Sequence, residues 1–122
     1  SRKTLDEIFE ILPSYNIPSI LLHWFDGSKK QLQKAMDLDY YVSFGPVTVY
    51  SKDKQVLLSK ANQDKILVET DGPVRFSRCF SNRIAQISFI PSVIFCASKV
   101  LDTHYENMCK ILEQNSQRFL IL

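Results

Sequence analysis

The chain has 122 residues, of which 45% are hydrophobic and 23% are charged, and its net charge is +2. These values predict that residues 1–122 form a single globular unit with its own core, and the charge is too small to indicate a nucleic-acid partner by itself. No apolar run approaches the roughly 18 residues of a transmembrane helix, and no secretory signal is present, so we expect no membrane association. Three widely spaced cysteines without a Cys-x-x-Cys pattern predict reduced thiols in a cytoplasmic protein.

Helices and strands are predicted to alternate from the start of the chain. Residues 4–7 match a capping box, and apolar residues follow at helical spacing until Pro13 ends the helix. Residues 19–25 form an apolar run typical of a buried strand. A second capping box at residues 28–31 opens a helix with an apolar face that comprises Leu32, Ala35 and Met36.

The same pattern continues in the middle of the chain. Residues 40–44 are predicted to form a strand that Gly45-Pro46 stops, and Ser51 is predicted to cap the next helix. We expect the side chains of Val56, Leu57 and Lys60 in that helix to face the sheet. Residues 65–70 are predicted to form a third strand, in which an apolar run leads into Glu69 and, just beyond the strand, Asp71 and Gly72-Pro73.

The last third of the chain is predicted to be a loop followed by two helices. The loop after Pro73 has about 15 residues, which is long enough to indicate function or disorder. Pro91 suits the first turn of the next helix, and residues 103–106 match a third capping box that opens the final helix.

Strands that recur about every 20 to 25 residues with a helix between them predict an α/β fold with a parallel sheet and right-handed crossovers. Three strands are too few for a closed barrel, which needs eight strands and about 250 residues. The chain is therefore either a small open sheet or the second half of a barrel.

Polar residues collect where each predicted strand ends, namely His23, Ser43, Glu69 and Asp71. Because parallel strands point the same way, these side chains are expected to share one rim. Imidazole and carboxylate are common ligands of divalent metals, so the pattern is consistent with a metal site. Glu69 and Asp71 are two residues apart and are expected on the same face, where like charges need a counter-charge or a cation.

Each of these residues also has a purely structural interpretation. His23 could be a neutral side chain that packs against Trp24 and Phe25 and bonds to a carbonyl group. Asp71 could belong to a simple turn, since Asp-Gly favours turns. Ser43 could be no more than a hydroxyl at the end of a strand.

The loop at residues 74–83 alternates basic and aromatic residues. Arg75 and Arg78 could bind substrate phosphate, and the phenylalanines could stack on bases. The alternative is a solvated loop that two phenylalanines hold against the protein. His104 lies on the last predicted helix, away from the rim, and has no assigned role.

Four stretches of the chain together match a known pattern. Residues 22–28 read Leu-His-Trp-Phe-Asp-Gly-Ser, and residues 67–73 read Leu-Val-Glu-Thr-Asp-Gly-Pro. They resemble the His-Cys-Phe-Ser-Gly and Leu-Glu-Thr-Asp-Ala-Pro stretches of the TatD family of metal-dependent DNases. Residues 41–44 are similar to the family's next strand, and residues 113–120 resemble its C-terminal Thr-x-Asn-Ala-x-Arg-Leu-Phe.

The resemblance implies a TIM (β/α)8 barrel, of which this chain would supply strands six to eight with their helices. It implies a hydrolase that cleaves DNA with two divalent metal ions (Mg, Mn or Zn) in the complete site. By that analogy His23 would bind one metal, and Asp71 would bind the other and orient or deprotonate the attacking water. Glu69 would be a supporting acid.

The departures from the family pattern concern the rest of the site. The family's N-terminal His-x-His, its metal-bridging Glu and a further His on the fifth strand have no counterpart here. We therefore expect the chain to be the C-terminal portion of such a protein and inactive alone. Its partners would be DNA and either the missing N-terminal half of the barrel or a second copy. Alternatives are a metallohydrolase acting on amides or esters, and a non-catalytic remnant that pairs with another chain.

Overall fold

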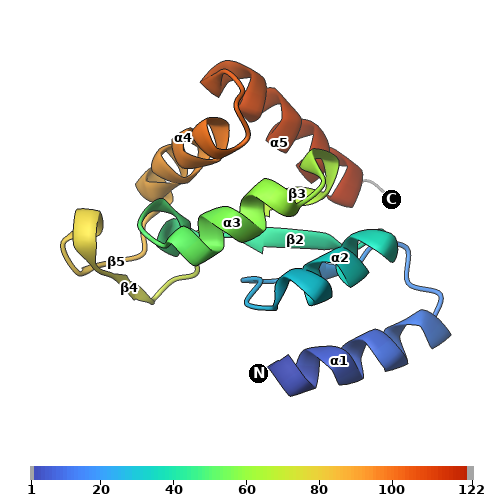
Figure 1. The fold of residues 1–122 in the computed structure, drawn as a ribbon. Helices are drawn as coiled ribbons and strands as arrows, with labels where there is room; N and C mark the ends of the chain where they lie inside the picture. The colour runs from blue at the N-terminus through green and yellow to red at the C-terminus, as the bar shows by residue number, and fades with distance from the viewer. Residues whose placement is uncertain (1, 121–122) are drawn as a thin grey trace.

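Helices alternate with the strands of a small parallel sheet (Figure 1). The computed structural model describes residues 2–120. Its parallel sheet has the strand order β1-β2-β3, formed by β1 (Leu21–Leu22), β2 (Tyr41–Phe44) and β3 (Ile66–Val68). The α-helices of the described part are α1 (Arg2–Ile11), α2 (Lys29–Asp37), α3 (Lys52–Lys60), α4 (Ile90–Val100) and α5 (Tyr105–Leu120). The α/β class and the parallel strands predicted from the sequence are thus confirmed.

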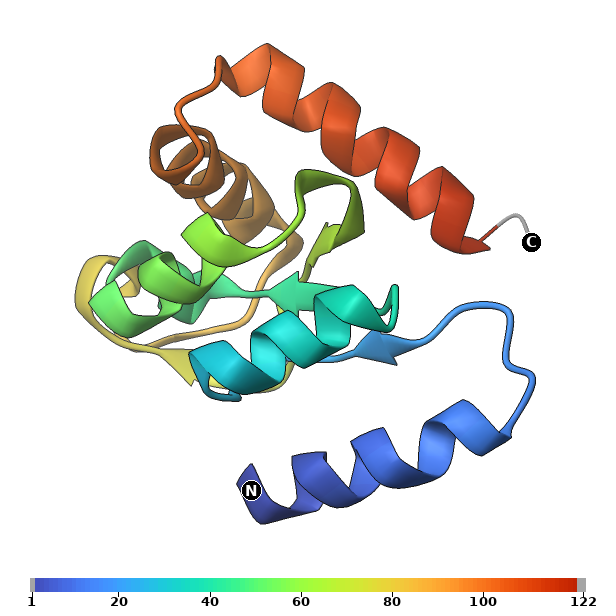
Figure 2. The same ribbon diagram turned by 45° about the vertical axis from the view of Figure 1, so that its right-hand side comes forward.

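The main core lies between the sheet and the helices. Leu22, Val42, Phe44 and Ile66 alternate along the strands and pack against buried residues from all five helices named above. In Figure 1, α1 lies below the sheet and α4 and α5 lie above it, and Figure 2 shows the helices following one another around it. Because the strands are covered in this way, they read as nearly continuous apolar runs.

The other face of the sheet carries the alternate residues. Ser43 pairs in register with Leu67, so the two side chains lie on the same face, and Glu69 follows Leu67 by two positions. Tyr41 is on this face as well, and its ring centroid lies 5.2 Å from that of Phe119 near the end of α5. This face therefore changes from apolar to polar toward the carboxyl ends of the strands.

Several predicted helix signals are confirmed by hydrogen bonds. Ser28 Oγ accepts from the Gln31 backbone N–H at 3.2 Å, and Gln31 Oε1 accepts from the Ser28 N–H at 2.9 Å, which completes the capping box. Ser51 caps α3 by accepting from the backbone N–H of Lys54, and Pro91 lies in the first turn of α4.

Other predicted details were wrong. Helix α1 already includes Arg2–Thr4, so Thr4 is not its N-cap. In α3 the buried residues are Leu57 and Leu58, whereas Val56 and Lys60 are exposed. The strands are also shorter than the apolar runs, because only the residues that pair with a neighbour form the ladder. At Trp24, for example, φ is 48° and the chain turns away directly after β1.

The long loop after Pro73 is ordered around a hairpin and an aromatic cluster. β4 (Arg75–Phe76) and β5 (Arg83–Ile84) pair antiparallel. Phe76, Phe80 and Phe89 are buried in a second hydrophobic cluster that Trp24 joins from the end of β1. The hairpin was not predicted, because its strands have only two residues each.

Helix α5 is anchored to the sheet by one buried amide. Asn115 is fully buried, and its Nδ2 donates to the backbone carbonyls of Gln63 at 2.7 Å and Ile66 at 2.8 Å. Its Oδ1 accepts from Arg118 Nη2 at 2.5 Å. All three cysteines are free thiols, as predicted. Within residues 2–120, no helix is long and apolar enough to span a membrane.

Candidate functional site

His23 and Glu69 meet at the carboxyl ends of β1 and β3. His23 follows β1 directly, and Glu69 follows β3 directly. His23 Nε2 lies 3.0 Å from Glu69 Oε2. The two residues are 46 positions apart in the sequence, and the parallel strands bring them together, so the predicted shared rim is confirmed for this pair.

Ser43 connects the middle strand to the same pair. Its side chain is buried, and its hydroxyl donates to Glu69 Oε2 and accepts from the backbone N–H of Trp24 at 2.9 Å. A continuous set of contacts thus runs from Trp24 through Ser43 and Glu69 to His23. Sequence reasoning treated Ser43 as a strand-end hydroxyl. The sequence signal that could have predicted the Ser43–Glu69 hydrogen bond was the position of both residues on the same face of the sheet.

Glu69 carries an unsatisfied oxygen. Its side chain is 11% exposed, whereas that of His23 is 55% exposed. Oε1 is buried and has no hydrogen-bond partner among the described residues. A Cβ placed on Gly45 would lie 3.9 Å from this oxygen, so the glycine leaves room beside it. A buried carboxylate oxygen without a donor is costly, and a cation or a donor from a ligand would relieve that cost.

Asp71 lies beyond the strand and is not joined to this pair. Its φ is 55°, and its backbone carbonyl accepts from the N–H of Val74 at 3.2 Å, so the turn interpretation is correct for its backbone. The expectation that Asp71 lies on the same strand face as Glu69 was wrong, because β3 ends at Val68. In the described part of the chain, no group of three or more His, Cys, Asp or Glu residues is arranged to hold a metal ion.

Imidazole and carboxylate are suitable metal donors, and the unpartnered Oε1 of Glu69 fits a cation nearby. The described residues therefore fit as contributors to a metal site. Divalent metals in proteins take four or more ligands, so these donors alone do not complete one. The alternative for His23 was a hydrogen bond to a carbonyl group. The described contacts do not include such a bond, and Nε2 of His23 faces Glu69.

The loop beyond Asp71 combines exposed arginines with buried phenylalanines. Arg75 and Arg78 are exposed, and Arg75 Nη1 donates to the backbone carbonyl of Asn82 at 3.1 Å. Phe76 and Phe80 are buried against the protein, which supports the alternative of a loop held by two phenylalanines. The Trp24 and Phe76 rings stack with centroids 5.7 Å apart, which ties this loop to the chain beside His23.

A depression lies next to the His23–Glu69 pair on the open face of the sheet. Its volume is about 260 Å³, and Ser43 and Leu67 also line it. The end of α5 forms another part of its wall through Ser116 and Phe119. The pair is therefore accessible from the face opposite the main core.

Comparisons with known proteins agree with this arrangement. A model of the family described as TatD related DNase matches residues 1–120. The uncharacterized metal-dependent hydrolase YabD of Bacillus subtilis (strain 168) is 26% identical over 123 aligned positions, covering 97% of this chain and 48% of YabD. An uncharacterized metal-dependent hydrolase of Haemophilus influenzae is 32% identical over 76 positions, which are 60% of this chain and 29% of that protein.

Two solved structures share the fold. YJJV, a TatD homolog from Escherichia coli K12, has a TM-score of 0.88 and 20% identity, with 100% of this chain and 48% of YJJV covered. A TatD family hydrolase from Entamoeba histolytica has a TM-score of 0.77 and 12% identity, with 96% and 46% covered. These proteins are TIM barrels, so the three strands correspond to part of such a barrel. The chain spans less than half the length of the relatives it matches.

Proposed function

The chain belongs to the TatD related DNase family, and from that membership we propose that it is part of a metal-dependent hydrolase that cleaves phosphodiester bonds in DNA. The observation that carries the proposal is the His23–Glu69 pair at the strand ends, with the unpartnered Oε1 of Glu69. Two relatives are named metal-dependent hydrolases, which supports the same class of activity.

We assign separate roles to the residues of the rim. His23 would bind one divalent metal ion, and Asp71 would bind a second and orient the attacking water. Glu69 would act as a supporting acid that holds His23 in place, and Ser43 would hold Glu69. When bound, Mg, Mn or Zn supplies Lewis acidity toward a phosphoryl oxygen. The remaining ligands would come from residues outside this chain.

The charge of the loop supports a polyanionic substrate. Residues 74–89 contain three arginines and no acid, whereas the rest of the chain has 12 Lys and Arg against 13 Asp and Glu. The positive charge of the chain is thus concentrated beside the rim. Arg75, Arg78 and Arg83 are all exposed, and the described residues give them no ion pair with a carboxylate. We propose that they contact DNA phosphates.

The sheet supports the proposal that the strands belong to a larger barrel. β1 and β3 each have one edge without a partner strand among the described residues. Unpaired edges favour the addition of further strands. We propose that residues 1–122 act as one unit, which completes its sheet with the remaining part of the barrel or associates with a second copy.

The proposal is tested by measuring metal content and hydrolysis. The 122-residue chain and the longest protein encoded in frame with it are assayed against DNA, RNA, amide and ester substrates. We expect the longer protein to bind metal and cleave DNA, and the 122-residue chain to be inactive. His23→Ala should lower kcat/KM by at least about 100-fold, since even outer-shell changes cost about 10- to 100-fold.

His104→Ala is the matched control, because this exposed histidine lies directly before α5 and outside the rim. It should leave activity unchanged. A longer protein that binds no metal would overturn the proposal and favour the non-catalytic alternative. Hydrolysis of amides or esters without DNA cleavage would contradict the assigned substrate, and activity of the 122-residue chain that His23→Ala abolishes would contradict the need for further ligands.

A further inference from the structure

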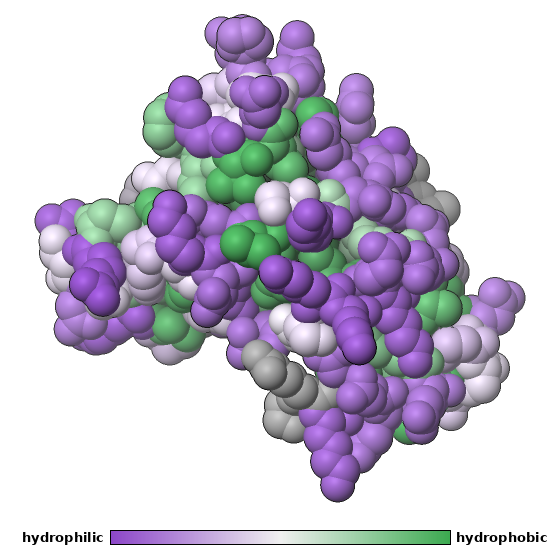
Figure 3. All heavy atoms as spheres, viewed as in Figure 1, coloured by the Kyte–Doolittle hydropathy of each residue, from purple (hydrophilic) through white to green (hydrophobic). Residues whose placement is uncertain are grey.

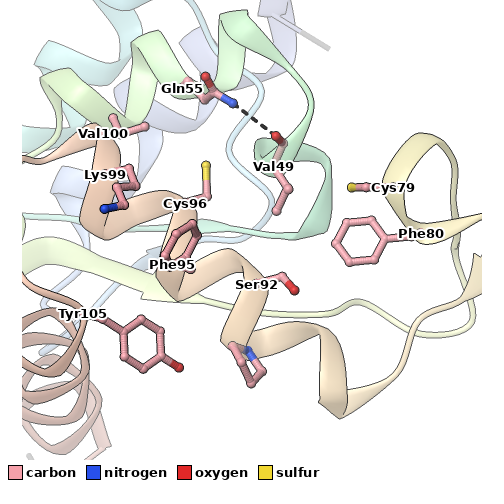
Figure 4. A pocket seen from close by; sticks show the side chains of 11 residues that line it. Val49, Gln55, Cys79, Phe80, Ser92, Phe95, Cys96, Lys99, Val100 and Tyr105 are labelled. Carbon is pink, nitrogen blue, oxygen red and sulfur yellow. Dashed lines mark hydrogen bonds between the residues drawn. The ribbon is translucent and has the colours of Figure 1, made fainter.

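A large cavity lies away from the rim, between α3, α4 and the loop after Asp71. Its volume is about 850 Å³, within the range of small-molecule sites in proteins. None of His23, Glu69 and Asp71 lines it. Figure 4 shows that its walls come from segments far apart in sequence, with Phe95 of α4 on one side and Phe80 of the loop on the other.

The cavity walls are mainly apolar. Phe80, Phe95 and Val100 contribute to them, and Phe95 is 53% exposed although it is a large aromatic residue. Burial raises the pKa of the Cys96 thiol above its ordinary value of 9.0, so this wall residue is neutral at pH 7. Cys96 Sγ also lies 3.6 Å from the Thr48 carbonyl oxygen. A cavity of this kind exposes aromatic surface that a ring could cover.

Lys99 is the cationic side chain among the residues that line this apolar surface. Lys99 lines the cavity, and its Nζ lies 5.2 Å from the Phe95 ring centroid. The ion pairs among the described residues do not include Lys99. The hydroxyl-bearing Tyr105 lies on the same side in Figure 4. Charge complementarity therefore favours an anion at this end of the cavity.

The cavity does not lie at the free edges of the sheet. New strands can pair only at the free edges of β1 and β3. The cavity lies instead between α3 and α4, which contact each other within the described chain.

We propose that this cavity binds a small molecule with a planar apolar ring and one anionic group. The ring lies against Phe80 and Phe95, and the anionic group lies at Lys99. The inference does not depend on the proposed hydrolase activity, because the cavity and the rim share none of the residues named as ligands.

The probe is 8-anilinonaphthalene-1-sulfonate, a planar aromatic anion that fluoresces when bound. We expect saturable binding of one probe per 122-residue chain. Lys99→Gln should weaken it by about five-fold, the effect of one charge pair near a surface. Lys110→Gln is the matched control. It removes the same charge, but Lys110 is an exposed residue of α5 that does not line the cavity.

Ser92→Trp provides a second variant that fills the cavity from an exposed position in α4. It should abolish saturable binding while the circular dichroism spectrum stays unchanged. Equal affinity in the wild-type chain, Lys99→Gln and Ser92→Trp would overturn the proposal, as would binding that does not saturate at one probe per chain.

The thiols supply an independent readout. Cys79 and Cys96 line the cavity, whereas Cys109 does not. Bound probe should slow alkylation of Cys79 and Cys96, measured by peptide mass spectrometry, and leave Cys109 unaffected. Equal protection of all three thiols, or protection of none at saturating probe, would contradict the assigned site.

Discussion

Replacement of Ser43 by alanine tests how the candidate site is held together. The Ser43 hydroxyl is buried between two partners, the carboxylate of Glu69 and the backbone N–H of Trp24. The Ser43→Ala chain loses both bonds at once. Glu69, whose Oε1 already lacks a partner among the described residues, is then left with His23 alone.

The expected loss of stability follows from these contacts. A hydrogen bond to a charged group contributes about 1.5–3 kcal/mol, and one between neutral groups contributes about 1 kcal/mol. We therefore expect Ser43→Ala to lower the free energy of unfolding by about 3 kcal/mol. With a urea slope of about 1.5 kcal/mol per molar, the unfolding midpoint should fall by about 2 M. In the longer protein that contains this chain, Ser43→Ala should also lower metal affinity by about ten-fold, as for other outer-shell changes.

Urea denaturation of the 122-residue chain followed by circular dichroism measures the first effect, and equilibrium dialysis of the longer protein with Mn²⁺ measures the second. Ser59→Ala is the matched control, since the exposed Ser59 hydroxyl only donates to the carbonyl of Val56 in its own helix. It should change the free energy of unfolding by less than about 0.5 kcal/mol. If Ser43→Ala and Ser59→Ala have the same unfolding midpoint, the inferred role of Ser43 is wrong.

Three further predictions concern other parts of the chain. Asn115→Ala should lower the free energy of unfolding by about 2–4 kcal/mol because two backbone carbonyls lose their donor. Asn107→Ala, at an exposed position of the same helix, should lower the free energy of unfolding far less. Equal urea midpoints of the Asn115→Ala and Asn107→Ala chains would refute this account. When glutamine replaces Arg75, Arg78 and Arg83, the plot of the logarithm of the DNA-binding constant against the logarithm of the salt concentration should become shallower by about 2, at about 0.7 per phosphate contact with a single strand. Fluorescence anisotropy over a series of salt concentrations measures this slope. An unchanged slope would exclude phosphate contacts by these arginines. The control chain, with glutamine at Lys52, Lys60 and Lys110, should keep the slope of the wild type. Because burial raises the pKa of Cys96, the neutral thiol contributes stability that is complete below pH 9.0 and is lost as the pH rises through the higher pKa of the folded state. Thermal unfolding across this pH range should show a smaller decline in Cys96→Ala, and an identical decline would contradict the assignment.

The alternation of elements was predictable because it depends on local patterns. Ser28 and Ser51 precede their helices and bond to backbone N–H groups within one turn, so their signals need no distant partner. Runs such as 40–44 read as buried strands because continuous apolar runs are typical of parallel sheets, and every residue of β2 is buried. The parallel arrangement followed from these two features and predicted that His23 and Glu69 would share a rim.

The errors arose where distant contacts decide the outcome. Val56 and Leu57 are adjacent apolar residues, and only the packing of α3 against the sheet shows that Leu57 is the buried one. The loop phenylalanines could face solvent or protein, and the cluster with Trp24 holds them inside. Asp71 follows a predicted strand, but its left-handed backbone moves it out of the strand pattern.

The sequence by itself determined the order of the α-helices and the parallel strands, the direction of these strands and the end of the sheet at which His23 and Glu69 would lie, because these depend on short periodic patterns. Only the tertiary structure decided that Ser43 links these two residues, that Oε1 of Glu69 lacks a partner among residues 2–120, and that a cavity opens between α3 and α4. Such features come from side chains that are far apart in the chain, and their contacts form only when the strands pair and the helices pack.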